Sequence, residues 1–272
     1  MNGKILDESS SAYHGSDAVS HSKLETFRRR PLLFKKRYID KSLAPESSSA
    51  FVIGSALHCA VLEADEYAHR YVTRPDGIDR RTKAGKEAYE AFTAANEGKE
   101  VMEREDAELV SRMASAVRDH QIANQLLSGL GQAEVTWRVN EDGIPASIQC
   151  RTDWIDEQQG YVVDVKTVDN LDGDQFTRNV VNFGYHRQLG FYSHVLAKCG
   201  LSDLRYYFVC VEKREPYGVQ VFCAQQKLLE IGYKESLQDL DRMKQCYASN
   251  VWPNIPTDII YLGLPEWYKE AK

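Results

Sequence analysis

Residues 161–167, YVVDVKT, place a carboxylate and an amine two positions apart, at Asp164 and Lys166. The apolar residues Val163 and Val165 predict that this segment is a buried strand. Because residues two apart in a strand share a face, the Asp164 and Lys166 side chains should project together. A carboxylate can bind a hard divalent cation, and a neighbouring ammonium group can stabilise charge that develops on phosphate oxygens. The segment therefore indicates metal-assisted chemistry on a phosphate ester.

A second acid, Asp153, lies in the preceding segment, CRTDWID. If EQQG closes a hairpin with an even-numbered loop, of four residues or two, Asp156 pairs with Tyr161 and Asp153 with Asp164. Directly opposed side chains have Cβ atoms about 5 Å apart, where two like charges are destabilising unless a cation such as Mg²⁺ lies between them. The alternative is a chance Asp-x-Lys sequence that forms a surface ion pair. The buried setting and the opposed Asp153 favour a site.

Three further residues are candidates on weaker grounds. Arg151 shares the face of Asp153, where its guanidinium could hold a phosphate, or equally pair with a nearby acid. Glu134 shares that face if NEDG is a four-residue loop. Because Glu134 lies one strand further out, we expect it to assist the site rather than to ligate a metal. His58 lies one helical turn after Gly54 on an apolar helix, where a core histidine is the alternative to a functional one.

The segments around these residues predict helices in the first half of the chain. Residues 1–17 are polar and Ser-rich, and we expect a flexible lead-in. Ser20 is a candidate N-cap for a helix that Pro31 interrupts. FVIGSALHCAVLE is typical of a buried helix, and the spacing predicts amphipathic helical stretches over residues 82–96 and 103–127.

From Ala133 the period changes to that of strands. Residues 133–139, 144–155 and 161–167 predict an antiparallel meander through the turns NEDG and EQQG. A helix over 185–198, strands over 204–213 and 217–223 and a helix over 225–247 follow. The expected fold is α/β, with helices packed on a central mixed sheet in a single domain over residues 18–272.

Composition limits the possible partners and compartments. The net charge of −6 counts against a nucleic-acid partner, yet the clusters Arg28–Arg30 and Lys35–Arg37 could form a local basic surface, or equally a solvated helix face. The chain has no apolar run near the roughly 18 residues of a membrane helix, so we expect no membrane association. Six scattered cysteines predict reduced thiols and a cytoplasmic location, and exclude a structural zinc or iron–sulfur site.

Several sequence blocks together resemble a known superfamily. GSALHCAVLE, CRTDWID, VVDVKT and YHRQLGFY occur in the order found in PD-(D/E)xK nucleases, and they are most similar to the RecB-like branch. FVCVEKREPYGVQVF resembles the sequence that follows in RecE-type exonucleases, the exonuclease VIII group. The resemblance covers about residues 18–260 and implies a restriction-endonuclease-like core.

The resemblance also implies roles for individual residues. His58, Asp153 and Asp164 would be metal ligands together with the Val165 carbonyl, and Lys166 would be the catalytic lysine. Gln188 and Tyr192 would line the DNA, and their i, i+4 spacing places both on one helix face. The second acid is Asp164, where many members carry Glu. The chain lacks the cysteine cluster of the iron–sulfur subgroup. Mn²⁺ should substitute for Mg²⁺ at a site with a His ligand, and without a Walker A motif no ATP is expected.

A RecE-type protein would be a processive 5′→3′ exonuclease acting on double-stranded DNA ends. It would leave 3′ single-stranded tails for a RecT-like annealing protein, and it would form a ring-shaped homo-oligomer, most simply a tetramer. An endonuclease or structure-specific nuclease of the same superfamily is the first alternative, and it would cut closed circular DNA. A non-catalytic DNA-binding module on this fold is the second, but all of Asp153, Asp164 and Lys166 are present.

Overall fold

A computed structural model describes residues 3–44, 49–255, 259 and 261–263. In this part of the chain a six-stranded mixed sheet has the order β1-β4-β5-β6-β7-β8. The parallel pair is β6 with β7, and the other neighbours are antiparallel. The strands are β1 (Gly3–Ile5), β4 (Gln132–Val139), β5 (Ile148–Asp156), β6 (Tyr161–Val168), β7 (Arg205–Glu212) and β8 (Val219–Cys223).

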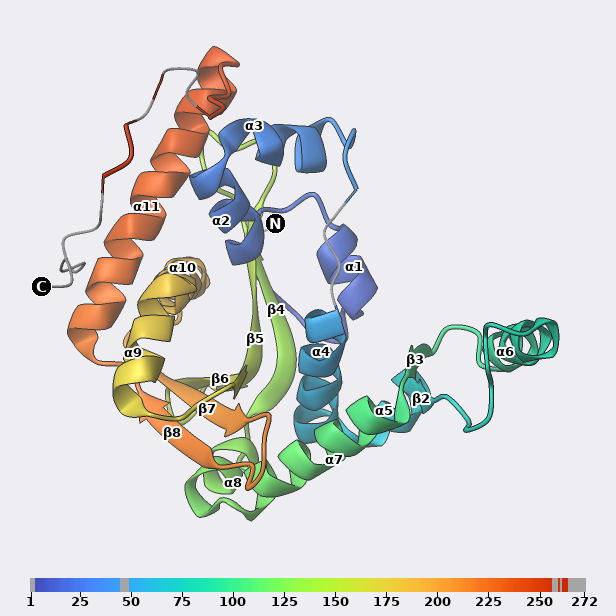
Figure 1. Ribbon diagram of the computed structural model, residues 1–272. Helices are drawn as coiled ribbons and strands as arrows, with labels where there is room; N and C mark the ends of the chain where they lie inside the picture. The colour runs from blue at the N-terminus through green and yellow to red at the C-terminus, as the bar shows by residue number, and fades with distance from the viewer. Residues whose placement is uncertain (1–2, 45–48, 256–258, 260, 264–272) are drawn as a thin grey trace, which may run out of the picture.

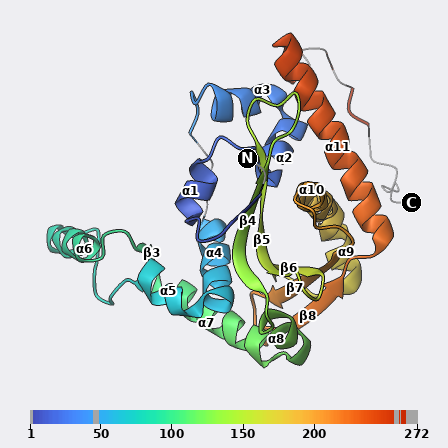
Figure 2. The ribbon, with the colours of Figure 1, turned by 180° about the vertical axis from the view of Figure 1, so that it is seen from behind.

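Helices cover both faces of this sheet (Figures 1 and 2). One core contains side chains from α2 (His21–Arg29), α9 (Gly173–Asn182), α10 (Tyr185–Lys198) and α11 (Gln226–Ser249). The other contains side chains from α4 (Ser49–Leu62), α7 (Arg104–Asp119) and α8 (Gln121–Leu127). The predicted α/β class with a central mixed sheet flanked by helices is confirmed.

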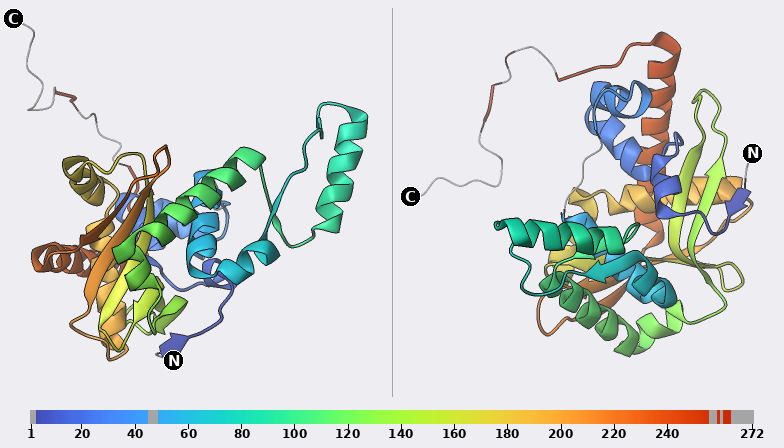
Figure 3. Two further views of the ribbon diagram at one scale, coloured as in Figure 1. Left: turned by 90° about the horizontal axis from the view of Figure 1, so that it is seen from below. Right: turned by 90° about the vertical axis from the view of Figure 1, so that its right-hand side faces the viewer.

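The smaller elements lie around this core. They are α1 (Ser10–Gly15), α3 (Pro31–Phe34), the π-helical turn η1 (Lys35–Ile39), α5 (Ala64–Arg70), β2 (Tyr71–Thr73), α6 (Lys83–Ala95) and β3 (Glu100–Met102). Strands β2 and β3 form a separate parallel pair, beyond which α6 projects away from the body (Figure 3). No helix among the described residues is long and apolar enough to cross a bilayer. All six cysteines are free thiols.

The hairpin between β5 and β6 has the predicted register. Asp156 pairs with Tyr161, so EQQG is a four-residue loop. The buried Asp156 carboxylate accepts a hydrogen bond from the Gln159 amide over 2.8 Å, and Gly160 takes a positive φ of 69°. A short acid that bonds its own loop, followed by a glycine, closes the turn without strain.

The connection between β4 and β5 differs from the prediction. Val139 pairs with Ile148, so the loop spans residues 140–147 and not only NEDG. The strand expected from Ile144 therefore begins at Ile148, because Pro145 cannot donate a ladder hydrogen bond. The longer loop is still even-numbered, and so Glu134 keeps its expected face.

Three further expectations from the sequence need correction. The expected lead-in contains β1, which pairs with β4, and α1, whose Tyr13 is buried. The expected helix over 103–127 is two helices, because His120 has an extended backbone and caps α8 through Nδ1 and the Ala123 amide. Helix α9, capped by Asp172, was not predicted, since its polar sequence reads as a loop. Residues 45–48, 256–258, 260 and 264–272 of the expected domain lie outside the described residues.

Strand β4 changes its buried face at Glu134. Val135, Trp137 and Val139 face the core under α10, whereas Ala133 packs against the core under α7. Glu134 itself has φ of 50°, in the left-handed region that L residues rarely adopt. The alternation of buried faces along β4 therefore reverses at this residue, beside the candidate site.

Candidate active site

Strands β5 and β6 separate just beyond the last pair of their ladder, Trp154 with Val163. Asp153 and Asp164 come next, one on each strand, as the register predicts. Asp153 Oδ2 accepts a hydrogen bond from the Val165 amide over 2.7 Å. The two acids are only 8% and 2% exposed. Two carboxylates are thus held in a largely buried setting where the hairpin opens.

Helix α4 brings His58 to the same place. His58 Nε2 lies 2.9 Å from the carbonyl oxygen of Val165, and Nδ1 lies 3.6 Å from Asp153 Oδ2. The helix is apolar, as predicted, but its histidine contacts the candidate site and is not enclosed by the core alone. His58 and the Val165 carbonyl therefore lie beside Asp153, and the resemblance implied a metal-binding role for all three.

Glu134 lies closer to these residues than we expected. The pairs Ala133–Trp154 and Val135–Thr152 place it directly opposite Asp153. Its Oε1 is 3.9 Å from His58 Nδ1. Ligand atoms of His58, Glu134 and Asp153 all lie within 4.8 Å of one another. Geometry thus makes Glu134 a candidate ligand and not only an auxiliary residue.

The Asp164 carboxylate faces a second group of side chains. Its Oδ2 lies 2.5 Å from Lys166 Nζ, and its Oδ1 accepts a hydrogen bond from Gln188 over 2.7 Å. Gln188 Nε2 also lies 3.3 Å from the Tyr192 hydroxyl, so both residues share one face of α10, as their spacing predicts. Lys166 Nζ lies 5.0 Å from the centre of the Tyr185 ring. An aromatic face and a carboxylate together fix the position of the ammonium group.

Arg151 is committed to other contacts. Its Nε donates to the Thr136 hydroxyl over 3.1 Å, its Nη2 donates to the Glu8 carbonyl, and its guanidinium lies 4.6 Å from the Tyr13 ring centre. Arg151 Nη1 is also 3.7 Å from Glu134 Oε2. The sequence left open whether Arg151 holds a phosphate or pairs with a nearby acid. This geometry fits the second role, with Glu134 as the acid.

Burial and crowding of acids shift the pKa values of these groups. Burial raises the pKa of Glu134, and the Asp153 charge raises it further, to about 7. Burial also raises the pKa of Asp164, with Lys166 opposing and Asp153 adding to the shift. For His58 and Lys166, burial lowers the pKa, but the surrounding carboxylates outweigh it and the net shift is upward. The negative charges are thus incompletely compensated by the side chains present.

A hard divalent cation fits this donor set. The donors are mainly carboxylate and carbonyl oxygens, the class that Mg²⁺ and Mn²⁺ prefer. His58 Nε2 and the Val165 oxygen are 2.9 Å apart, and neighbouring ligands of an octahedral ion with bonds of about 2.1 Å stand about 3 Å apart. Asp164 Oδ2 is buried and, despite its close ion pair, has no hydrogen bond of good geometry. A bound cation would give this oxygen a partner.

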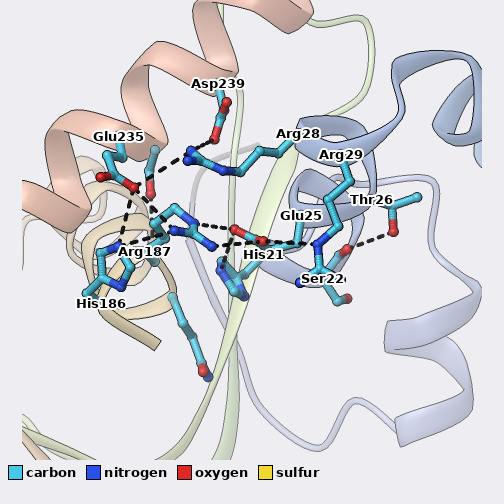
Figure 4. Close-up of polar contacts among 12 residues, drawn as sticks. His21, Ser22, Glu25, Thr26, Arg28, Arg29, His186, Arg187, Glu235 and Asp239 are labelled. Carbon is cyan, nitrogen blue, oxygen red and sulfur yellow. Dashed lines mark hydrogen bonds and ion pairs between the residues drawn. The ribbon is translucent and has the colours of Figure 1, made fainter. Parts of the chain in front are cut away.

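An ion-pair network joins the start of α10 to α2 and α11 (Figure 4). Arg187 donates to both oxygens of Glu25 on α2, over 2.5 Å and 3.1 Å. Arg187 also donates to Glu235 on α11 over 3.3 Å, and His186 Nε2 lies 3.3 Å from the same carboxylate. Because Gln188 follows Arg187 directly, this network holds in place the turn that carries Gln188.

The predicted basic cluster is partly neutralised by the same region. Arg28 donates to Asp239 on α11 over 3.0 Å and lies 3.7 Å from Glu235. Arg29 Nε is 4.0 Å from Glu25. Arg28 therefore joins α2 to α11 through ion pairs, a role that neither alternative from the sequence had anticipated.

Two residues near the site were not identified from the sequence. Tyr185 lies three positions before Gln188, a spacing that shares a helix face and could have identified it. Glu8 contacts Arg151 and Arg138, and it comes from the segment taken for a lead-in, where no local pattern marks it.

Comparison with known proteins extends these observations. A family model described as "PDDEXK-like domain of unknown function (DUF3799)" matches residues 20–262. The fold is similar to a crystal structure described as "Putative exonuclease" from Eubacterium rectale. That likeness has a TM-score of 0.64 at 12% identity over 96% of this chain and 97% of the other. The crystal structure of SSO0001 gives a TM-score of 0.29 at 14% identity, over 78% of this chain and 99% of that one. No curated protein sequence matches the chain.

Proposed function

The chain belongs to the PDDEXK-like domain family, and we propose that it is a metal-dependent deoxyribonuclease with Asp153, Asp164 and Lys166 at its active site. The observation that carries the proposal is the convergence of these three residues with His58 and the Val165 carbonyl at the open end of one hairpin. The side chains come from β5, β6 and α4, so no local sequence motif alone would assemble them.

In this proposal, Asp153 and Asp164 hold the cation through their carboxylates, with the Val165 carbonyl, His58 and Glu134 as further donors. Bound Mg²⁺ or Mn²⁺ would act as a Lewis acid on the scissile phosphate and would lower the pKa of a water molecule. Lys166 remains protonated, because its pKa is raised, and it donates to charge that develops on the phosphate oxygens.

The remaining side chains position these groups. Gln188 donates to Asp164 Oδ1 and so holds that carboxylate with Oδ2 toward Lys166. The Tyr185 ring lies beside Lys166 and limits the directions that its flexible stem can take. Such fixed donors stabilise a transition state without having to reorganise during the reaction.

We further propose that the substrate is a double-stranded DNA end and that one strand is degraded processively from 5′ to 3′. Support comes from the order of the RecE-like sequence blocks, and from a structural neighbour whose description reads "Putative exonuclease". The 3′ tails would then serve a RecT-like annealing protein, with this chain in a ring-shaped homo-oligomer, most simply a tetramer. Light scattering of the purified protein measures the oligomer directly.

The nuclease assay uses linear and closed circular duplexes, labelled on the 5′ or the 3′ end, with Mg²⁺, Mn²⁺ or EDTA. The proposal predicts loss of linear DNA only, early release of 5′ label as mononucleotides, and no reaction in EDTA. Nicking of the closed circle would show an endonuclease instead. Intact DNA under every metal condition would contradict nuclease activity.

A further inference from the structure

Phe183 is a large apolar side chain on the surface beside the candidate site. It is 57% exposed, at the corner between α9 and α10. The corner is fixed by Gly184, which has φ of 72°. L side chains rarely adopt this φ, and a Cβ atom on Gly184 would also lie 2.5 Å from Arg187 Nη2, so the position favours glycine. The Phe183 amide also donates to the Asn179 carbonyl over 2.9 Å. Phe183 is therefore exposed on a backbone that is held in one conformation.

A row of contacts joins Phe183 to the active-site lysine. The Phe183 and Tyr185 ring centres are 5.7 Å apart, and the Tyr185 ring centre is 5.0 Å from Lys166 Nζ. Tyr185 is half-buried, and its ring also packs against Phe176 and Phe208. Phe183 is thus the outermost ring of this row and the one with substantial exposure.

The two distances limit where Phe183 stands along a bound strand. Its ring centre is no more than about 11 Å from Lys166 Nζ, and successive nucleotides advance about 3.4 Å along a strand. With about 3 Å more at each end for the stacked base and the bound phosphate, a base that contacts Phe183 would lie within a few nucleotides of a phosphate held by Lys166.

We propose that Phe183 stacks on a nucleobase of the DNA strand held in the active site, within a few nucleotides of the bond that is cut. This inference rests on the proposed function. An aromatic ring without a polar group suits any base, because every base offers a π face, and Lys166 supplies charge for the adjoining phosphate. Phe183 would hold the strand in register without reading its sequence.

A double-mutant cycle between protein and DNA tests this contact. Binding is measured by fluorescence anisotropy with Ca²⁺ in place of Mg²⁺, and DNA integrity is checked on a gel. Duplexes carry an abasic nucleotide at each of the first four positions of either strand. Phe183→Ala should weaken binding of intact DNA roughly tenfold. At one abasic position the same substitution should have no further effect, and Phe183→Trp should bind as the wild type does.

Val181→Ala is the matched control, because Val181 is 61% exposed two residues away and carries no ring. It should bind as the wild type does, and an equal loss in this variant would contradict stacking. A loss from Phe183→Ala that is the same at every abasic position, or a change in its oligomeric state, would also overturn the inference. Failure of wild-type protein to cleave DNA with Mg²⁺ or Mn²⁺ would instead contradict the proposed function, so the two outcomes are distinct.

Discussion

The Asp153 carboxylate accepts a hydrogen bond from the backbone amide of Val165 over 2.7 Å. If the β5–β6 ladder continued, Thr152 would lie opposite Val165. The Thr152 carbonyl oxygen would then accept the hydrogen bond of the Val165 amide. A side chain of β5 therefore takes over a ladder hydrogen bond at the point where the strands separate. The adjacent Val165 carbonyl is left to face His58, so the same feature brings together three of the expected metal donors.

Replacing Asp164 by Asn should not destabilise the metal-free protein. Burial and the Asp153 charge raise the pKa of Asp164 in spite of Lys166, so its negative charge is unfavourable on balance in the folded state. Asn removes that charge at nearly the same shape and still accepts from Gln188. Thermal melts in EDTA should show a melting temperature at or above that of the wild type.

Addition of Mn²⁺ should reverse this order. A ligand at about 100 times its Kd stabilises a native protein by about 2.7 kcal/mol. The wild type should gain stability of this order, and Asp164→Asn should gain little. An equal rise in both proteins would mean that Asp164 does not hold the cation.

The network behind α10 should contribute strongly to stability. Arg187 is buried and has a two-point ion pair with Glu25. In Glu25→Ala, the buried Arg187 charge keeps only its longer contact with Glu235. This change should lower the free energy of unfolding by about 3 kcal/mol. Arg29→Ala, on the same helix and exposed, should cost less than about 0.5 kcal/mol. Urea denaturation of both variants measures the difference, and equal costs would refute the role given to Arg187.

Protonation of Glu141 should contribute to the loss of folding stability in acid. Burial raises the pKa of Glu141, but hydrogen bonds from Lys198, Lys244 and His194 outweigh it and lower the pKa to about 2. Because the folded pKa is depressed, this stabilisation is present above the unfolded pKa of about 4.3 and is lost as the pH falls toward 2. Glu141→Gln should therefore be less stable than wild type at pH 7, by about 2 kcal/mol, and the gap should close between about pH 4.3 and 2.

Unfolding midpoints at pH 7, 5, 4 and 3 give this comparison. Glu97→Gln, which changes an exposed carboxylate, is the control and should follow the wild type at each pH. A gap for Glu141→Gln that is as large at pH 3 as at pH 7 would show that the ion pairs are not its origin.

The sequence predicted the centre of the site because that part depends on local rules. Strand periodicity and an even-numbered loop are sufficient to place Asp153 and Asp164 on neighbouring positions of β5 and β6, whichever even loop length is chosen. The exact partner of Glu134 depends on the true loop length, which Pro145 extends beyond NEDG. The positive φ of Glu134 could not be predicted either, because glutamate rarely adopts this conformation and no local sequence pattern indicates it.

Contacts that join distant segments could not be predicted in the same way. Glu8 reaches Arg151 because β1 adds to the edge of the sheet. A strand of only three residues has too little sequence pattern to be predicted. Arg28 and Arg187 are paired through α2, α10 and α11, whose packing is set by whole helix faces. The resemblance to PD-(D/E)xK nucleases singled out His58, for which periodicity alone left a core role open, and Gln188, for which the spacing gave only a helix face shared with Tyr192.

DNA hydrolysis by Lys166→Ala beside the wild type tests the central claim most directly. The measurement is the release of acid-soluble nucleotides from linear duplex with Mg²⁺, with circular dichroism to show that the variant is folded. Loss of a positioned donor to the transition state predicts a rate at least about 100-fold lower. Lys227→Ala, which removes an exposed lysine on α11, should hydrolyse DNA as fast as the wild type. A folded Lys166→Ala protein with wild-type activity would contradict the assignment of the active site.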